Sequence, residues 1–111
     1  MIAVIFEAEP SPGRHDSYLD IAEKIRPLLE EVEGFVSVER FQSLTNPGKL
    51  LSLSFFADEV AVRRWREMAE HRAGQAAGRH GVFAHYRLRV AEVIRDYSIA
   101  DRAQVPASPV P

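Results

Sequence analysis

Apolar and polar residues alternate along the chain with two different periods, and the changes between these periods mark the predicted elements. Residues 2–9 are rich in β-branched side chains and are followed by Pro10, Pro12 and Gly13, which indicates a strand and then a loop. Apolar side chains stand at both parities of this stretch. We therefore expect a strand that is covered on both of its sides.

From Asp16 the apolar residues recur every three or four positions, which is typical of an amphipathic helix. Pro27 removes one hydrogen bond of this helix at a cost of about 3 kcal/mol. The apolar stripe continues in phase beyond it, so we predict one kinked helix that Gly34 ends as a C′ glycine. The stripe consists of Tyr18, Ile21, Ala22, Ile25, Leu28, Leu29 and Val32.

A hairpin is predicted next. Residues 35–44 and 50–56 have the composition of strands, and the turn Asn46-Pro47-Gly48-Lys49 between them is short enough to make the pair antiparallel. The later strand alternates cleanly, because successive side chains of a strand point to opposite faces. One face carries Leu51, Leu53 and Phe55, and the other carries Ser52 and Ser54.

The second half of the chain contains a helix, a strand and a tail. Asp58 is a suitable cap for a helix that includes Trp65. Glycines at positions 74, 78 and 81 weaken this helix, so we expect a break near residues 70–72 and a short helical piece up to about Arg79. Residues 83–98 predict a fourth strand. The proline-rich end, residues 99–111, predicts an extended tail or an arm on a neighbouring chain.

The order strand, helix, strand, strand, helix, strand predicts an α+β, ferredoxin-like βαββαβ domain over residues 1–98. Its four-stranded antiparallel sheet would carry both helices on one face. The other face would be bare, with apolar residues from the first and third strands forming a patch larger than soluble monomers usually expose. We therefore expect a twofold homodimer that packs through the open sheet face.

Composition narrows the classes of function. The net charge of −2 gives no long-range attraction for nucleic acid or for an anionic membrane, and no run approaches the roughly 18 apolar residues of a membrane span. The lack of cysteine excludes disulfides, thiolate metal sites and a cysteine nucleophile. The apolar start is too short for a signal peptide, so we expect a cytoplasmic protein.

The run from Phe35 through FQSLTNPGKLLSLSFF to Trp65, followed by EHRAGQAAGRHGVFAHYRLRVAEVIRDY, resembles the antibiotic biosynthesis monooxygenase family of small dimeric α+β barrel proteins. The resemblance covers about residues 1–98. It implies a cleft between the sheet and the helices, with Trp65 in its wall. The superfamily includes cofactor-free oxygenases of phenolic substrates and haem-degrading enzymes, so the resemblance leaves both activities open.

The haem-degrading branch combines an asparagine on the first strand, the helical tryptophan and an iron-binding histidine about three helical turns later. This chain has Phe6 and Glu7 at the strand position and Gln75 three turns after the tryptophan. The nearest histidines, His71 and His80, are the candidate iron ligands if haem is bound. The cofactor-free branch often uses the same asparagine.

Cofactor-free oxygenation requires a dry aromatic pocket, a base for a phenolic proton and a donor for the developing anion. His71 is the candidate base, because the unperturbed pKa of histidine lies nearest neutral pH. Gln75 and Arg79 follow at four and eight residues, on the same face if the segment is helical, and can hold the oxyanion. A solvated surface helix is the structural alternative for this His- and Arg-rich stretch.

Trp65 is the first candidate for the pocket wall, with ordinary core packing as the alternative. The candidate substrate contacts that complete an aromatic wall are Phe6, Phe41, Phe55 and Tyr86, and each of these is equally consistent with the core or the dimer interface. His15 is expected at the surface. The arginines Arg87, Arg89 and Arg95 are expected to pair with Glu7, Glu39 or Glu92.

A metal site formed by His71, His80 and His85 matches no known ligand spacing, so no metal is predicted.

The sequence leaves three hypotheses for the function. The first is a dimeric oxygenase that acts on a small aromatic or quinol-type molecule without a cofactor. The second is a haem-binding or haem-degrading monooxygenase, and the third is a non-catalytic dimeric protein that binds a small apolar ligand.

Overall fold

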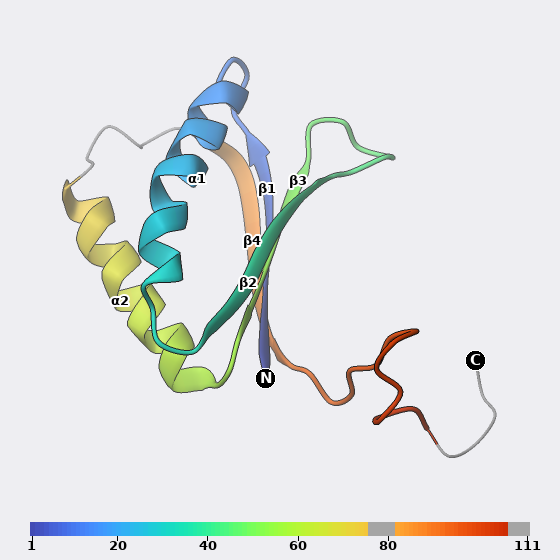
Figure 1. The fold of residues 1–111 in the computed structure, drawn as a ribbon. Helices are drawn as coiled ribbons and strands as arrows, with labels where there is room; N and C mark the ends of the chain where they lie inside the picture. Colours follow the sequence, from blue (N-terminus) through green and yellow to red (C-terminus); the bar gives the residue numbers. More distant parts are fainter. Residues whose placement is uncertain (76–81, 107–111) are drawn as a thin grey trace.

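The computed structural model describes residues 1–75 and 82–106, with side chains described for residues 1–69 and 82–106. The elements in order are β1 (Ile2–Pro10), α1 (His15–Glu30), β2 (Phe35–Gln42), β3 (Leu50–Phe56), α2 (Glu59–Gln75) and β4 (Phe83–Glu92). The strands form one antiparallel sheet in the order β2-β3-β1-β4. Both helices lie on the same side of this sheet (Figure 1). The ferredoxin-like βαββαβ prediction is confirmed.

Several predicted boundaries were wrong. Strand β2 ends at Gln42, two residues before the predicted end at residue 44. A break in α2 was expected near residues 70–72, but the helix continues through these residues to Gln75. The alanines, glutamates and arginines of this stretch have high helix propensity, and they outweigh the cost of Gly74 inside the helix. Strand β4 ends at Glu92, so the predicted strand over 83–98 was too long. The helical piece expected up to Arg79 lies outside the described residues.

A further correction concerns the end of helix α1 and the role of Gly34. Helix α1 is a single helix that contains Pro27, as predicted, but it ends at Glu30, and Gly34 belongs to the turn before β2. Its φ of +91° is a conformation that side chains with a Cβ rarely adopt. A Cβ at this position would lie 2.8 Å from the Cβ of Ala61. The glycine is therefore required by the close approach of this turn to α2.

Residue Asp58 caps α2, as predicted. Its carboxylate oxygen Oδ1 accepts a hydrogen bond from the backbone N–H of Ala61 at 2.9 Å, which satisfies one of the free donors of the first turn. At the other end of the preceding loop, the backbone N–H of Ala57 donates to the Gly34 carbonyl at 2.7 Å. These two bonds fix the start of α2 against the β2 turn.

The pairing registers assign each strand residue to one face of the sheet. On the helix-covered face, Arg40, Ser52, Phe6 and Leu88 form one row across all four strands, because each is paired with the next. The parity of the strands places Leu51, Leu53 and Phe55 of β3 on the open face, together with Ile5 of β1. The predicted apolar character of the open face is confirmed by these positions.

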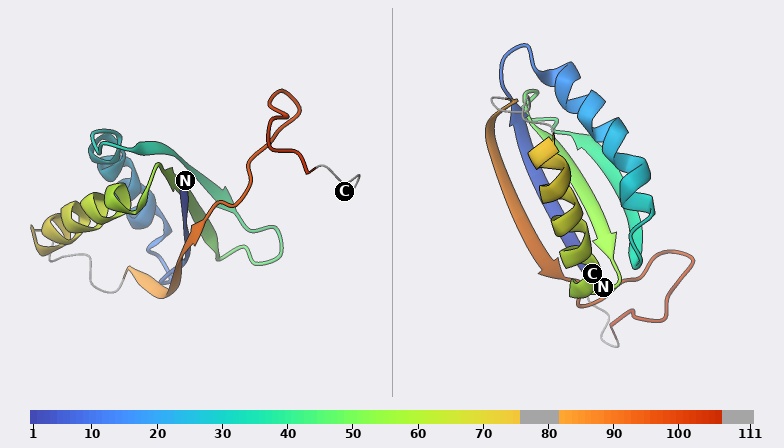
Figure 2. Two further views of the ribbon diagram at one scale, coloured as in Figure 1. Left: turned by 90° about the horizontal axis from the view of Figure 1, so that it is seen from below. Right: turned by 90° about the vertical axis from the view of Figure 1, so that its left-hand side faces the viewer.

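Two clusters of buried residues hold the helices on the sheet. The first contains Val4, Leu29, Val38, Phe56 and Ala61, and Trp65 packs against it. The second contains Ala8, Tyr18, Leu50 and Val82, with Phe6 and Phe83 packed against it. The end of α1 and the start of α2 lie close together, and the two helices separate toward their other ends (Figure 1). Both helices cross the same face of the sheet (Figure 2).

The chain after β4 extends away from the sheet and contains no helix or strand between Val93 and Pro106 (Figure 1). It is organised locally: the backbone N–H of Asp96 donates to Gln104, and the Arg102 guanidinium lies 5.6 Å from the centre of the Tyr97 ring. Ile94 and Ile99 are almost fully exposed, at 87% and 98%. This segment therefore leaves its apolar side chains without a covering partner within the described chain.

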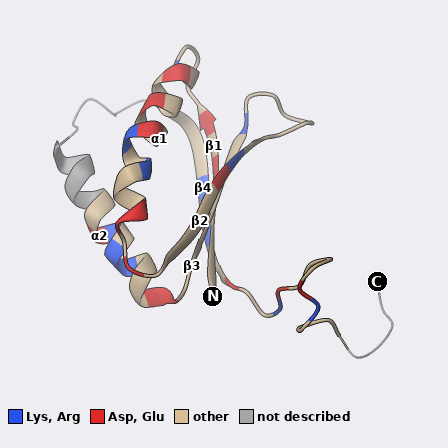
Figure 3. Cartoon of the chain, in the orientation of Figure 1, with Lys and Arg blue, Asp and Glu red and all other residues tan. Residues whose placement is uncertain are grey.

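Residues of both charge signs lie along α1 and along the first turns of α2 (Figure 3). Among the described residues, neither helix is both long and apolar enough to cross a membrane.

Candidate functional site

A cavity of about 300 Å³ lies between the two helices and the sheet. Its lining includes members of both buried clusters, so it occupies the place where the two clusters meet. Helix α1 contributes the side of its stripe from Tyr18 to Leu29, α2 contributes Trp65 and Ala69, and the segment before β4 contributes Val82. A cavity of this size, largely apolar and with few polar groups, has the character of a small-molecule site.

The floor of the cavity is formed by the middle of the sheet. Arg40, Ser52, Phe6 and Leu88 line it in their cross-strand row, and Ser54 lies beside them, paired with Val4. The two serines are small, and they stand where larger apolar residues would reach the helices. The local sequence of β3 therefore creates the space.

Aromatic rings form the inner wall. The Phe83 ring packs edge-to-face on Phe6 and on Tyr18, with 5.6 Å between ring centres in both pairs. Tyr86 stacks on Phe6 at 5.7 Å, and it is 61% exposed. Offset and edge-to-face contacts of this kind fix ring orientation, so this wall is rigid.

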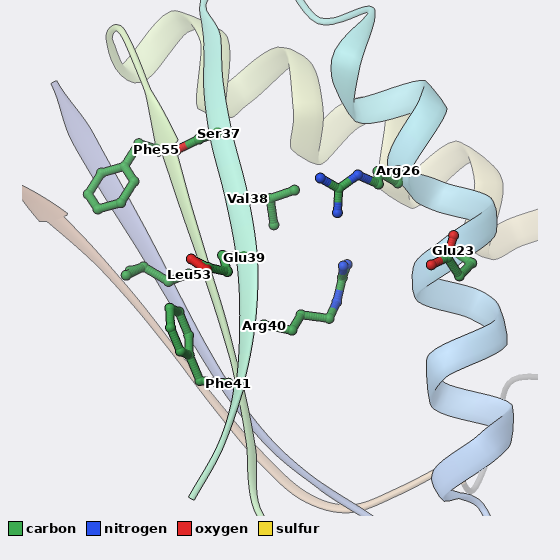
Figure 4. Close-up of a pocket in the computed structure, with 9 residues that line it drawn as sticks. All are labelled: Glu23, Arg26, Ser37, Val38, Glu39, Arg40, Phe41, Leu53 and Phe55. Carbon is green, nitrogen blue, oxygen red and sulfur yellow. The ribbon is translucent and has the colours of Figure 1, made fainter.

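Among the described residues that line the cavity, Arg40 is the one that carries a charge. It comes from the edge strand β2, and its side chain points toward α1, into the space that Arg26 also faces (Figure 4). Its Nε atom is buried and has no hydrogen-bond partner among the described residues. A buried guanidinium nitrogen without a partner is unusual, because desolvation of a charged donor is costly.

Comparison with known proteins identifies the family. A family model described as antibiotic biosynthesis monooxygenase matches residues 1–77. The chain belongs to the antibiotic biosynthesis monooxygenase family. It is 48% identical over 93 residues to the "Jasmonate monooxygenase ABM" of Pyricularia oryzae, and this match covers 84% of the chain but 43% of that protein. The chain thus spans less than half the length of that relative.

Other similar proteins are more distant. The uncharacterized protein YqjZ of Bacillus subtilis is 31% identical over 93 residues, covering 84% of this chain and 79% of that protein. Rv0793 of Mycobacterium tuberculosis shares the fold with a TM-score of 0.74 and 16% identity, covering 87% of this chain and 98% of that one. PA3566 of Pseudomonas aeruginosa has a TM-score of 0.70 and 12% identity, covering 84% and 93%.

The aromatic residues predicted for the site lie in two places. Trp65 and Phe6 line the cavity, and Tyr86 contacts Phe6 from the β4 side. Phe41 and Phe55 belong to the open face of the sheet, where they border a hollow with Leu53 (Figure 4). The structure therefore brings together only part of the predicted aromatic wall.

The predicted catalytic group lies at the end of α2. The backbone of His71 and Gln75 is helical, as the proposed spacing requires, and their side chains lie outside those described; Arg79 lies outside the described residues altogether. His15 is exposed, as predicted, and His85 is exposed as well. Within the described side chains, no histidine lines the cavity and no group of three or more His, Cys, Asp or Glu residues is placed to hold a metal.

The predicted pairing of the β4 arginines with acidic residues is confirmed for one pair. The Arg89 guanidinium donates to the Glu7 carboxylate at 3.3 Å on the open face. Both groups remain partly exposed, so the pair contributes less than about 1 kcal/mol.

Sequence reasoning missed Arg40, Ser52 and Ser54 as site residues. A signal for them was present, because Arg40 has the same parity as the buried Val38, and the two serines share the face of the buried Leu50 and Phe56. Polar residues at strand positions that face the core, in two paired strands, indicate either a cavity or a buried polar contact.

Proposed function

We propose that the protein is a monooxygenase that binds a small, largely apolar substrate in the cavity between the helices and the sheet and works without a metal or flavin. The observation that carries the proposal is the 300 Å³ cavity with Trp65 in its wall, in a chain of this family. The name of the Pyricularia oryzae relative supports a monooxygenase reaction.

The reaction fits a substrate that supplies its own electrons. A base removes a proton from an activated phenolic or quinol-type molecule, and the resulting carbanion reduces dioxygen. One oxygen atom becomes a carbonyl at the reacting ring carbon, which loses its hydrogen. The other oxygen leaves as water with that hydrogen and the hydrogen of the phenolic hydroxyl group. The protein then has to exclude bulk water, hold the substrate and move one proton.

The proposed roles of individual residues follow from this chemistry. His71 is the base, and Gln75 and Arg79 stabilise the oxyanion, since their spacing of four and eight residues would put all three on one face of a continuous helix. Trp65 and Phe6 hold the substrate ring, with Tyr86 supporting Phe6. We propose that Phe41 and Phe55 serve the subunit interface.

We also propose a homodimer formed through the open face of the sheet. Leu51, Leu53 and Phe55 lie there on one strand, with Ile5 on the next strand and Phe41, 42% exposed, on the edge strand. A contiguous apolar surface of this kind is expected to be covered in solution. Light scattering at micromolar concentration should give the mass of two chains, and a monomeric mass would contradict the proposal.

The test of the reaction is dioxygen consumption by metal-free protein with a panel of phenols, quinols and jasmonate, followed by mass spectrometry of the product. Ser54→Leu is the informative variant, because it fills the floor of the cavity without removing a proposed catalytic group. Ser17→Leu is the matched control on α1, outside the cavity lining and away from the open face. We expect oxygen consumption by the wild type and the control, and at least a tenfold lower rate in Ser54→Leu.

Three other outcomes separate the alternatives. Turnover that requires added haemin, with a Soret band lost in His71→Ala or His80→Ala, would establish the haem-dependent reaction instead. Ligand-induced stabilisation without oxygen consumption would leave a binding protein. Equal rates in Ser54→Leu and the wild type would place the reaction outside this cavity.

A further inference from the structure

Arg40 is a cation held at a mainly apolar cavity without a protein anion. Among the described residues, no carboxylate oxygen lies within 4.0 Å of its guanidinium, whereas Arg26, Arg64 and Arg89 each have an acidic partner. Its Nε is buried and donates to nothing described. The residue as a whole is partly exposed, so the guanidinium can be reached from solution while its buried Nε lacks a partner. A buried donor without a partner lowers stability, and a molecule that arrives from solution could supply the missing acceptor.

A second cation faces the same space. The Arg26 side chain extends from α1 toward β2, and its guanidinium and that of Arg40 point toward one another between the two elements (Figure 4). Arg26 is held at its Nε by Glu30 at 3.5 Å. Glu23 lines the same outer hollow but lies beyond ion-pair distance of Arg40. Two guanidinium groups that face one another repel, and an anion between them would remove that repulsion.

The cavity beyond Arg40 changes character along the sheet. Ser52 follows Arg40 in the cross-strand row, and then come Phe6 and Leu88. Tyr18 and Phe83, whose rings are in contact, line the far end. A molecule that lies along this row would therefore meet a cation at the edge of the sheet, a hydroxyl next, and aromatic and aliphatic groups at the inner end.

From this polarity we infer that the cavity binds an apolar molecule that carries a carboxylate, with the carboxylate held by Arg40 and the apolar body directed toward Phe6 and Trp65. The planar guanidinium offers parallel N–H donors that match the two oxygens of a carboxylate. The inference rests on the proposed function only in regarding this molecule as a substrate, because binding itself does not require turnover.

The experiment compares two ligands that differ only in the charged group. Octanoate and 1-octanol are titrated into the wild-type chain by calorimetry at pH 7, with fluorescence of Trp65, the one tryptophan of the sequence, as a second readout of cavity occupancy. We expect octanoate to bind at least about tenfold more tightly than the alcohol, as one charge-assisted contact predicts. This comparison needs no variant.

The variants assign the preference to a residue. Arg40→Met keeps the length of the side chain and removes the charge, so we expect octanoate affinity to fall about 10- to 100-fold and octanol affinity to change less than about threefold. Arg40→Lys should restore part of the preference. Arg64→Met is the matched control, since Arg64 lies on α2, is about half exposed and pairs with Glu33, and it should change neither affinity.

Thermal unfolding of the unliganded variants supplies an independent readout. If Arg40 is kept for a ligand, Arg40→Met should melt no lower than the wild type, because a buried donor without a partner has been removed. A clearly lower melting temperature, with unchanged octanoate affinity, would show that Arg40 is structural and would overturn the inference.

The remaining outcomes distinguish this inference from the proposed reaction. Equal affinity for octanoate and octanol in the wild type would overturn the carboxylate site even if uncharged quinols were oxidised. Tight octanoate binding that depends on Arg40, without oxygen consumption by any substrate, would support the site and contradict the oxygenase.

Discussion

The centre of the sheet is polar on the face that the helices cover and apolar on the open face. A monomeric protein would ordinarily have its apolar residues under the helices and its polar residues on the open face. On the face covered by helices, the middle of β3 presents Ser52 and Ser54, and the neighbouring strand adds Arg40. On the open face, the same strand presents Leu53 and Phe55. Apolar residues therefore face away from the helices at the point where they would ordinarily pack beneath them.

This reversal connects the cavity with the proposed dimer. The serines do not fill the space under the helices, so a cavity remains between the two buried clusters. The leucines and phenylalanines on the other side remain without cover in a single chain, and burial of apolar surface is the main driving force for association. This arrangement supports the two proposals together: a small molecule bound on the covered face and a second chain bound on the open face.

The largest expected effect comes from breaking the open face. Leu53→Asp would place an unpaired carboxylate at two equivalent positions of the twofold interface, and burial of unpaired charge costs several kcal/mol. We expect dimer affinity to fall about 1,000-fold, or about 4 kcal/mol, as measured by analytical ultracentrifugation over a range of concentrations.

The control for this variant is Leu44→Asp in the β2–β3 hairpin. Leu44 is 97% exposed and lies outside the strands, so the same substitution there should leave the dimer intact. Leu53→Asp chains that remain dimeric with unchanged affinity would show that the open face is not the interface.

A smaller effect is expected from moving the helix layer. Gly34→Ala combines a positive φ of +91° with a Cβ contact of 2.8 Å to Ala61 at the start of α2. We expect a loss of about 3 kcal/mol in the free energy of unfolding, measured by denaturant titration, because conformational strain and overpacking add. Ligand affinity should fall as α2 shifts, while dimer affinity, which depends on the opposite face, should not.

Gly13→Ala separates the two causes. Gly13 has a similar φ of +77°, but a Cβ there would meet nothing within 4 Å. Its substitution should therefore cost only about 1 kcal/mol and should leave ligand affinity unchanged. Equal losses of unfolding free energy in Gly34→Ala and Gly13→Ala would mean that the Cβ contact with α2 contributes nothing to the destabilisation.

The sequence predicted the layers of this molecule better than its site. The alternation of apolar and polar residues follows directly from burial, so the element order, the Asp58 cap, the single helix through Pro27 and the apolar open face were all predictable. The positions of Phe41 and Phe55 depend on which face each strand turns toward the helices, and this is fixed only by pairing with β1.

Arg40 shows why the site was harder to predict. Its parity is that of the core, but a single arginine in an edge strand is ordinarily a solvated residue. Only the assembled structure shows that its Nε is buried, that it lacks an acidic partner among the described residues and that it faces the same space as Arg26. These are tertiary facts, and no local pattern of residues encodes them.

The smallest expected effect tests whether the two faces respond independently. Asp58→Ala removes the hydrogen bond from the Ala61 N–H to the Asp58 carboxylate, and loss of such a cap typically costs about 1 kcal/mol. Asp58→Asn is the matched control, because the asparagine oxygen retains the cap. We expect Asp58→Ala to unfold at lower denaturant concentration than Asp58→Asn, with dimer affinity unchanged in both. Helix α2 lies on the covered face of the sheet, opposite the proposed dimer interface. A parallel loss of dimer affinity in Asp58→Ala would therefore show that the helices and the open face are coupled through the sheet and do not respond independently.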